Sequence, residues 1–212
     1  MSLALFFIDK VWRAKMSRSP EAKRRRLNVA RTVGRAARAA RIAPRPTSTG
    51  VRAVGTSIYF YCPVSPSTLL ELHVALQRAA EDLQEAWAAE SSWEIGIWVY
   101  INAGGGSYAE GLAAYDIVRM CGVHVTTVVV GRAQGAAALM AMGGTLRVMT
   151  SSARIVPAAA TDAPACDALA ERDVVVDVYA RDDKATISAI IDLGRGVFAL
   201  EAREIGLVDE VW

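Results

Sequence analysis

Two apolar runs, each as long as a β-strand, constrain the fold of this chain most. They extend from Ile95 to Ile101 and from Val123 to Val130. A strand that is covered on both faces is apolar throughout, whereas apolar and polar residues alternate in a strand that has one face exposed to solvent. Glycines and then a helical pattern follow each run, and this order favours parallel strands joined by helices. The sequence therefore predicts an α/β domain on a parallel sheet that helices cover on both faces.

Local signals add further elements. Ile58 to Cys62 is β-branched and aromatic, which predicts a first strand. Ser65 before Pro66 starts a helix whose apolar residues recur every three or four positions to about Ala89. A capping box of Ser107 and Glu110 predicts a helix to about Cys121. We also expect strands at 146–149 and 154–156 and helices at 136–142, 165–180, 184–192 and 199–205.

Composition narrows the class of protein. The 212 residues are 53% hydrophobic and 22% charged, which suffices for one sizeable core. No apolar run reaches the roughly 20 residues that a membrane-spanning helix needs. The three cysteines are scattered without a zinc-binding spacing, so the sequence predicts no metal site and no disulfide framework, as in a reducing compartment.

The charge is divided between two parts of the chain. Residues 1–55 hold 14 Lys and Arg against two acids, whereas the remainder holds 10 against 20. An Arg-rich, alanine-rich and acid-poor segment that ends in Pro, Ser, Thr and Gly is typical of an organelle transit peptide. We therefore expect a basic extension at 1–55 and a folded domain at 56–212. Nucleic-acid binding through phosphate contacts is one alternative, and a solvated tail or an upstream start codon that is not used is the other.

The turn after Ile101 has a second interpretation. Gly104-x-Gly106-x-x-Ala109 lies between a strand and a helix, which matches the loose dinucleotide-binding pattern. The acid that would hold the ribose is missing, since Gly131 and Arg132 stand after the next strand. The sequence therefore favours no nucleotide cofactor.

Four sequence blocks together resemble the Clp protease proteolytic subunit family. They are Tyr100 to Ser107, Gly111 to Asp116, Gly131 with the small-residue helix after it, and Glu201 to Asp209. The resemblance covers about residues 58–211. It implies a crotonase-like superhelix of ββα units with a protruding handle helix, here in a shortened form. It also implies assembly into two stacked seven-membered rings around a proteolytic chamber.

This sequence departs from the family pattern at the positions of the catalytic serine and histidine. Active members use a Ser-His-Asp triad, in which histidine takes the serine proton. The family serine follows four residues after the strand-ending glycine, and counting from Gly131 gives Gly135. The family histidine follows four residues after an arginine, and counting from Arg154 gives Ala158. The sequence thus predicts neither a nucleophile nor a base at this site.

The acid position stays open between Ile190 and Asp192. The chain has two histidines, His73 on an early helix and His124 before a strand, and neither is placed to activate Ser151 or Ser152. The turn at Gly105 and Gly106, which presents amides to the oxyanion in active relatives, is retained.

The resemblance is therefore to the non-catalytic R-type Clp subunits, in which glycine likewise replaces the nucleophile. It implies a structural subunit in mixed rings with serine-bearing and other R-type Clp subunits, docked to an AAA+ unfoldase, with no nucleic-acid partner, no metal and no cofactor. The expected location is the chloroplast stroma, with the mitochondrial matrix as the alternative. The alternative function is a crotonase-like activity on an acyl-CoA, with Glu110 as its acid or base.

Overall fold

The computed structural model describes residues 50–89, 96–157, 168–180 and 184–212. Contacts divide the chain into Met1–Arg45 and Pro46–Trp212, and all described residues belong to the second unit. Within the described residues, no helix is long and apolar enough to cross a membrane.

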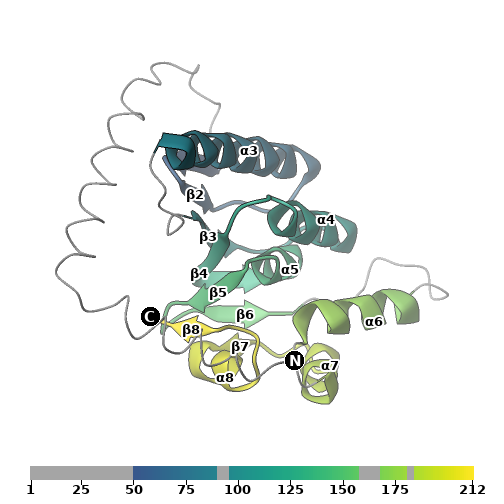
Figure 1. The fold of residues 1–212 in the computed structure, drawn as a ribbon. Helices are drawn as coiled ribbons and strands as arrows, with labels where there is room; N and C mark the ends of the chain where they lie inside the picture. The colour runs from purple at the N-terminus through teal and green to yellow at the C-terminus, as the bar shows by residue number, and fades with distance from the viewer. Residues whose placement is uncertain (1–49, 90–95, 158–167, 181–183) are drawn as a thin grey trace, which may run out of the picture. The chain divides into compact units, whose positions relative to one another are not determined.

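The second unit contains one eight-stranded sheet (Figure 1). Its strands follow the order β1-β2-β3-β4-β5-β8, and β6 pairs with β4 and β7 with β6. The β1–β2 and β6–β7 pairs are antiparallel, and the others are parallel. The strands are β1 Val51–Val54, β2 Ser57–Phe60, β3 Ile97–Ala103, β4 Val125–Gln134, β5 Leu146–Met149, β6 Arg154–Val156, β7 Val197–Phe198 and β8 Glu210–Val211.

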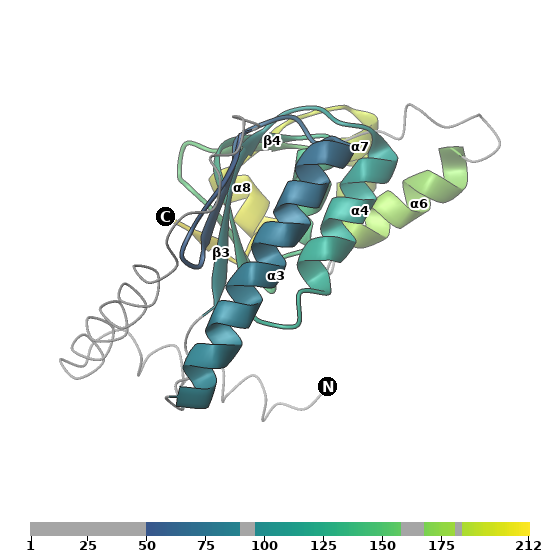
Figure 2. The same cartoon turned by 90° about the horizontal axis from the view of Figure 1, so that it is seen from above.

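The helices agree closely with the pattern in the sequence. Helices α3 and α4 lie side by side against one face of the sheet (Figure 2), and the capping box of Ser107 and Glu110 is present at the start of α4. The described helices are α3 Pro66–Ala89, α4 Tyr108–Arg119, α5 Ala136–Met142, α6 Ala168–Tyr179, α7 Lys184–Asp192 and α8 Ala199–Glu204.

The core lies between the sheet and the helices. In β3, Ile97, Val99 and Ile101 are fully buried and pack in one cluster with Leu72 and Leu76 of α3. Helix α5 is buried along its whole length. Small residues allow this close packing, because Gly111 of α4 lies directly against α5.

The opposite face of the sheet differs from the prediction of helices on both sides. Trp98 and Tyr100 of β3 alternate with the buried residues and are only half-buried. Tyr100 stacks on Tyr59 of β2, with ring centroids 5.1 Å apart, and Trp98 lies 5.6 Å from the ring of Trp212. These aromatic residues made the run look apolar throughout, although they face away from the core. We call Tyr59, Tyr61, Trp98, Tyr100 and Trp212 the aromatic row.

Two strand boundaries also differ from the prediction. Strand β1 falls inside the range 1–55 that the sequence assigned to the basic extension, and it pairs along its full length with β2. Strand β4 continues through Gly131 to Gln134, where the sequence predicted a turn, and this last part pairs with β6. Gly131 has φ +88° and lies beside Asn102, at a shift in the β3–β4 register, so the glycine marks a bulge within the strand.

Candidate functional site

The turn at Gly135 joins β4 to α5. Its φ of 62° and ψ of −124° lie in a region that favours glycine. The Gly135 amide donates to the Val156 carbonyl at 3.0 Å, and the Gly135 carbonyl accepts from the amides of Ala138 and Leu139. A sharp strand-to-helix turn of this kind presents the side chain of its first residue at the surface. Here the residue has no side chain, so the turn offers no hydroxyl or thiol.

The glycine turn after β3 lies beside the Gly135 turn. Gly105 and Gly106 have φ values of 82° and 105°. A β-carbon added to Gly106 would lie 2.8 Å from the Val64 carbonyl oxygen and 2.9 Å from the β-carbon of Ala136. Backbone packing therefore explains the glycine at 106. The structure brings together two of the predicted positions, the Gly105–Gly106 turn and Gly135.

Both histidines of the chain lie on other elements than the Gly135 turn. His124 precedes the first residue of β4 and Gly135 follows its last, so a strand of about 30 Å separates them. His73 has an exposed side chain on α3. Ser151 and Ser152 are exposed in the turn after β5, where the Ser151 amide donates to the carbonyl of Trp212. Ala158, the predicted histidine position, lies outside the described residues.

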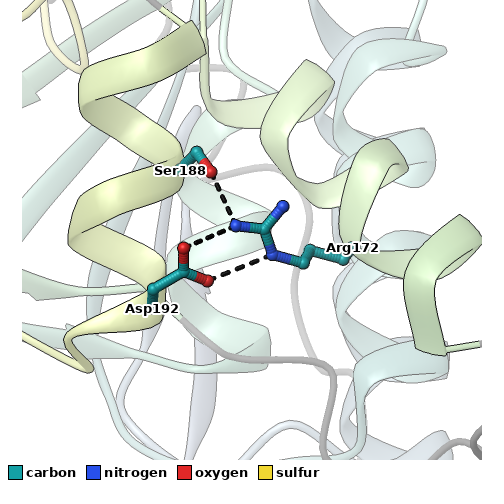
Figure 3. A network of polar contacts seen from close by, with 3 residues as sticks. All are labelled: Arg172, Ser188 and Asp192. Carbon is teal, nitrogen blue, oxygen red and sulfur yellow. Dashed lines mark hydrogen bonds and ion pairs between the residues drawn. The ribbon is translucent and has the colours of Figure 1, made fainter.

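The two candidates for the acid position differ in environment. Ile190 is a core residue of α7, with 3% of its surface exposed. Asp192 ends α7 and is held by Arg172 of α6, with Nε to Oδ1 at 3.1 Å and Nη2 to Oδ2 at 2.6 Å (Figure 3). The same Nη2 donates to Ser188 at 2.6 Å. The hydrogen bond and the charge of Asp192 raise the pKa of Arg172. Asp192 thus joins two helices.

This ion pair leads to a first prediction. Asp192→Asn should weaken the contact between α6 and α7, because the substitution removes the negative charge and replaces one of the two acceptor oxygens by an NH2 group, which cannot accept from the guanidinium. We expect faster amide hydrogen exchange in 168–179 and 184–192, with unchanged exchange in β3. Asp116→Asn, an exposed acid of α4, is the matched control. Equal exchange in the two variants would show that the pair does not hold the helices together.

Two cysteines and Glu110 are further candidates for chemistry among the described residues. Burial, with a contribution from Glu71, raises the pKa of the Cys62 thiol, and burial raises that of Cys121. Neither thiol is therefore activated as a thiolate. The Glu110 carboxylate accepts from the amide of Ser107 at 2.9 Å, which is the capping role and does not favour its use as an acid or base. Among the described residues, no group of three His, Cys, Asp or Glu could hold a metal ion.

The sequence interpretation missed three arginine contacts of this region. Arg172 binds Asp192, Arg132 lies against Gly104, and Arg154 lies over the ring of Phe198 at 5.6 Å. The partners come from separate elements, so no sequence spacing indicates them.

Comparisons with solved structures agree with this geometry. The chain is similar to ClpP1 from Listeria monocytogenes, with a TM-score of 0.64 and 17% identity over 74% of this chain and 91% of that one. It is also similar to the ClpP protease catalytic domain from Plasmodium falciparum, with a TM-score of 0.58 and 23% identity over 73% and 83%. At these identities the likeness establishes the fold, which is the predicted ClpP-like fold.

Sequence comparisons give the family. Relatives described as ATP-dependent Clp protease proteolytic subunits include those of Nephroselmis olivacea, at 36% identity over 55% of this chain and 64% of the relative, and Chlorella vulgaris, at 33% over 55% and 65%. The chain thus spans just under two thirds of the length of these curated relatives. The family model described as Clp protease matches residues 77–212, which include both glycine turns and the whole sheet from β3 onward. This chain therefore belongs to the Clp protease family.

Proposed function

We propose that this protein is a catalytically inactive, structural subunit of an ATP-dependent Clp protease core. The observation that carries the proposal is the Gly135 turn, which has the sharp backbone of a nucleophile turn and no nucleophile. The chain has two histidines, His73 on α3 and His124 just before β4, and neither belongs to this turn, which supports the absence of a histidine base. Hydrolysis by a Ser-His-Asp triad needs both groups.

A structural role needs the fold and its contact surfaces, and it does not need a catalytic triad. Position in a ring depends on contact surfaces, and a family fold can keep these after its chemistry is lost. The aromatic row supports this role, since Tyr61 and Trp212 are 47% and 51% exposed on the sheet face away from the helices. Exposed aromatic residues that gather on one face are typical of a binding surface.

The proposed partners follow from the family. The subunit assembles in mixed rings with serine-bearing Clp subunits and other R-type subunits, and the assembled core docks an AAA+ unfoldase. The proposed shortening of the handle concerns the segment between Ala158 and the block from Glu201 to Asp209, which contains α6 and α7. Its effect on contact between rings is part of the same proposal.

The part of the basic extension that precedes Val51 would act before assembly. The 14 basic and two acidic residues of the range 1–55 are the basis for proposing an organelle transit peptide. Because β1 is a paired strand of the sheet, we place the cleavage before Val51. The algal relatives favour a plastid, and we propose the chloroplast stroma, with the mitochondrial matrix as the alternative.

The test is the native mass and composition of the complex that a tagged copy enters in its own organism. A large assembly with serine-bearing Clp subunits, isolated from the plastid fraction, is the expected result. A monomer, or a small homo-oligomer without such subunits, would overturn the proposal.

A further inference from the structure

Two arginines lie side by side on the surface of the sheet. Arg132 of β4 and Arg154 of β6 are register partners on parallel strands, and both side chains are exposed. Register partners on neighbouring strands point to the same face. The face is the one opposite the core, because the residues that follow them, Ala133 and Ile155, are fully buried.

Both guanidinium groups rest on neighbouring backbone or ring atoms. A β-carbon at Gly104 would lie 3.0 Å from Nη2 of Arg132, and one at Gly196 would overlap the guanidinium of Arg154. Arg154 also lies over the Phe198 ring at 5.6 Å. The two groups therefore lean in opposite directions, one toward the turn after β3 and the other toward β7. We call Arg132, Arg154 and Phe198 the arginine stripe.

The positive charges of the arginine stripe have no acidic partner among the described residues. Arg172 and Arg195 each bind a carboxylate, of Asp192 and Glu201 respectively. No acidic side chain within the described ranges contacts Arg132 or Arg154. Two like charges on adjacent strands are unfavourable by themselves, and an incoming anion relieves the repulsion.

Phe198 adds an apolar component to the same place. It is 57% exposed and occupies the N-cap of α8 without a side-chain capping bond, a position where Ser, Thr, Asp or Asn would stabilise the helix. Leu200, in the first turn of α8, is 70% exposed. Cations beside exposed apolar groups suit a protein segment that carries carboxylates.

A polyanion such as nucleic acid fits the stripe less well. From Thr56 onward the chain carries 20 acidic against 10 basic side chains. This excess of negative charge repels a long polyanion while leaving a local carboxylate free to approach. We propose that the arginine stripe is a docking surface for a carboxylate-bearing segment of a neighbouring Clp subunit. This inference rests on the proposed ring role and names one surface that serves it.

The test compares tagged full-length variants in the native organism. Arg132→Glu/Arg154→Glu should reduce the fraction of the protein in the large complex about tenfold, because it replaces attraction by repulsion. Arg132→Lys/Arg154→Lys, which keeps the charge, should retain most of the assembly. The control, Arg78→Glu/Arg203→Glu, makes the same charge change at exposed positions of α3 and α8 and should assemble as the unaltered protein does.

Each outcome decides between the proposals. If the unaltered protein never enters a complex with serine-bearing subunits, the ring role and the stripe both fail. If it does enter and the Glu variant enters equally well, only the stripe is wrong. An equal loss in the control would show a general charge effect and also overturn the stripe. Retention of a fluorescent 20-nucleotide RNA by the unaltered protein, lost in the Glu variant, would assign the stripe to nucleic acid and overturn the inference.

Discussion

The purified chain is expected to hydrolyse a fluorogenic peptide about a million times more slowly than a serine-bearing member of its family. Removing the serine or the histidine of a serine protease triad alone lowers kcat by a factor of about 10⁶. The sequence predicts Gly135 at the serine position, and the two histidines lie outside this turn, His73 on α3 and His124 before β4. The measurement is steady-state cleavage by the isolated chain, with a serine-bearing family member as the positive control.

Gly135→Ser tests whether a base is present at the site, because this variant supplies the missing hydroxyl. A hydroxyl without a base should leave cleavage at the background level. The variant should also lose about 1–2 kcal/mol of stability, because a φ of 62° is unfavourable for a residue with a β-carbon. Gly135→Ala is the matched control for this strain. Cleavage by Gly135→Ser well above that by Gly135→Ala would reveal a base at the site and contradict an inactive role.

A Gly111→Val variant is expected to lose about 3 kcal/mol of unfolding free energy, with a melting temperature about 10 °C lower. A β-carbon at position 111 would lie 2.7 Å from the α-carbon of Ala136 and 2.8 Å from Cδ1 of Leu139. The first of these atoms belongs to the backbone and cannot rotate away. The added side chain must therefore force α4 and α5 apart.

Ala113→Val provides the control in the same helix. Ala113 is exposed, so its substitution costs only the lower helix propensity of valine, about 0.5 kcal/mol. Thermal unfolding followed by circular dichroism measures both variants. Equal melting temperatures would mean that α4 and α5 are not packed as closely as the structure shows.

Local signals predicted most of the fold. The capping box of Ser107 and Glu110, and the start of α3 at Pro66, depend on residues a few positions apart, and both are present. The length of α3 follows in the same way from apolar residues that recur every three or four positions. The resemblance of the four sequence blocks then predicted the family, which the comparisons confirm.

The errors arose where the deciding partner is distant in sequence. Strand β1 is short and mostly exposed, and its pairing with β2 is not visible in the basic stretch that contains it. Gly131 was interpreted as the end of a strand, whereas β6 extends the pairing of β4 beyond it. Trp98 and Tyr100 belong to a run that we interpreted as buried on both faces, although both side chains are half-buried on the sheet face opposite the core.

The candidate site was predictable only where it depends on residues that are close in sequence. Counting along the chain placed Gly135 after a strand, and the structure adds that Gly106 packs against the next residue, Ala136. The ion pair of Arg172 with Asp192 joins residues 20 positions apart on different helices. No spacing in the sequence indicates that this acid is held by an arginine. The roles of Ala158, Ile190 and Asp192 in relation to the family triad stay predictions.

We have proposed that the chain occupies a Clp ring without contributing to cleavage. The most direct measurement treats the purified native complex with a fluorophosphonate, which reacts with activated serines, and then weighs each subunit by mass spectrometry. We predict labelled serine-bearing subunits and an unlabelled copy of this chain in one complex. Labelling of this chain would show that it has an activated serine, and its absence from the complex would show that it does not occupy the ring.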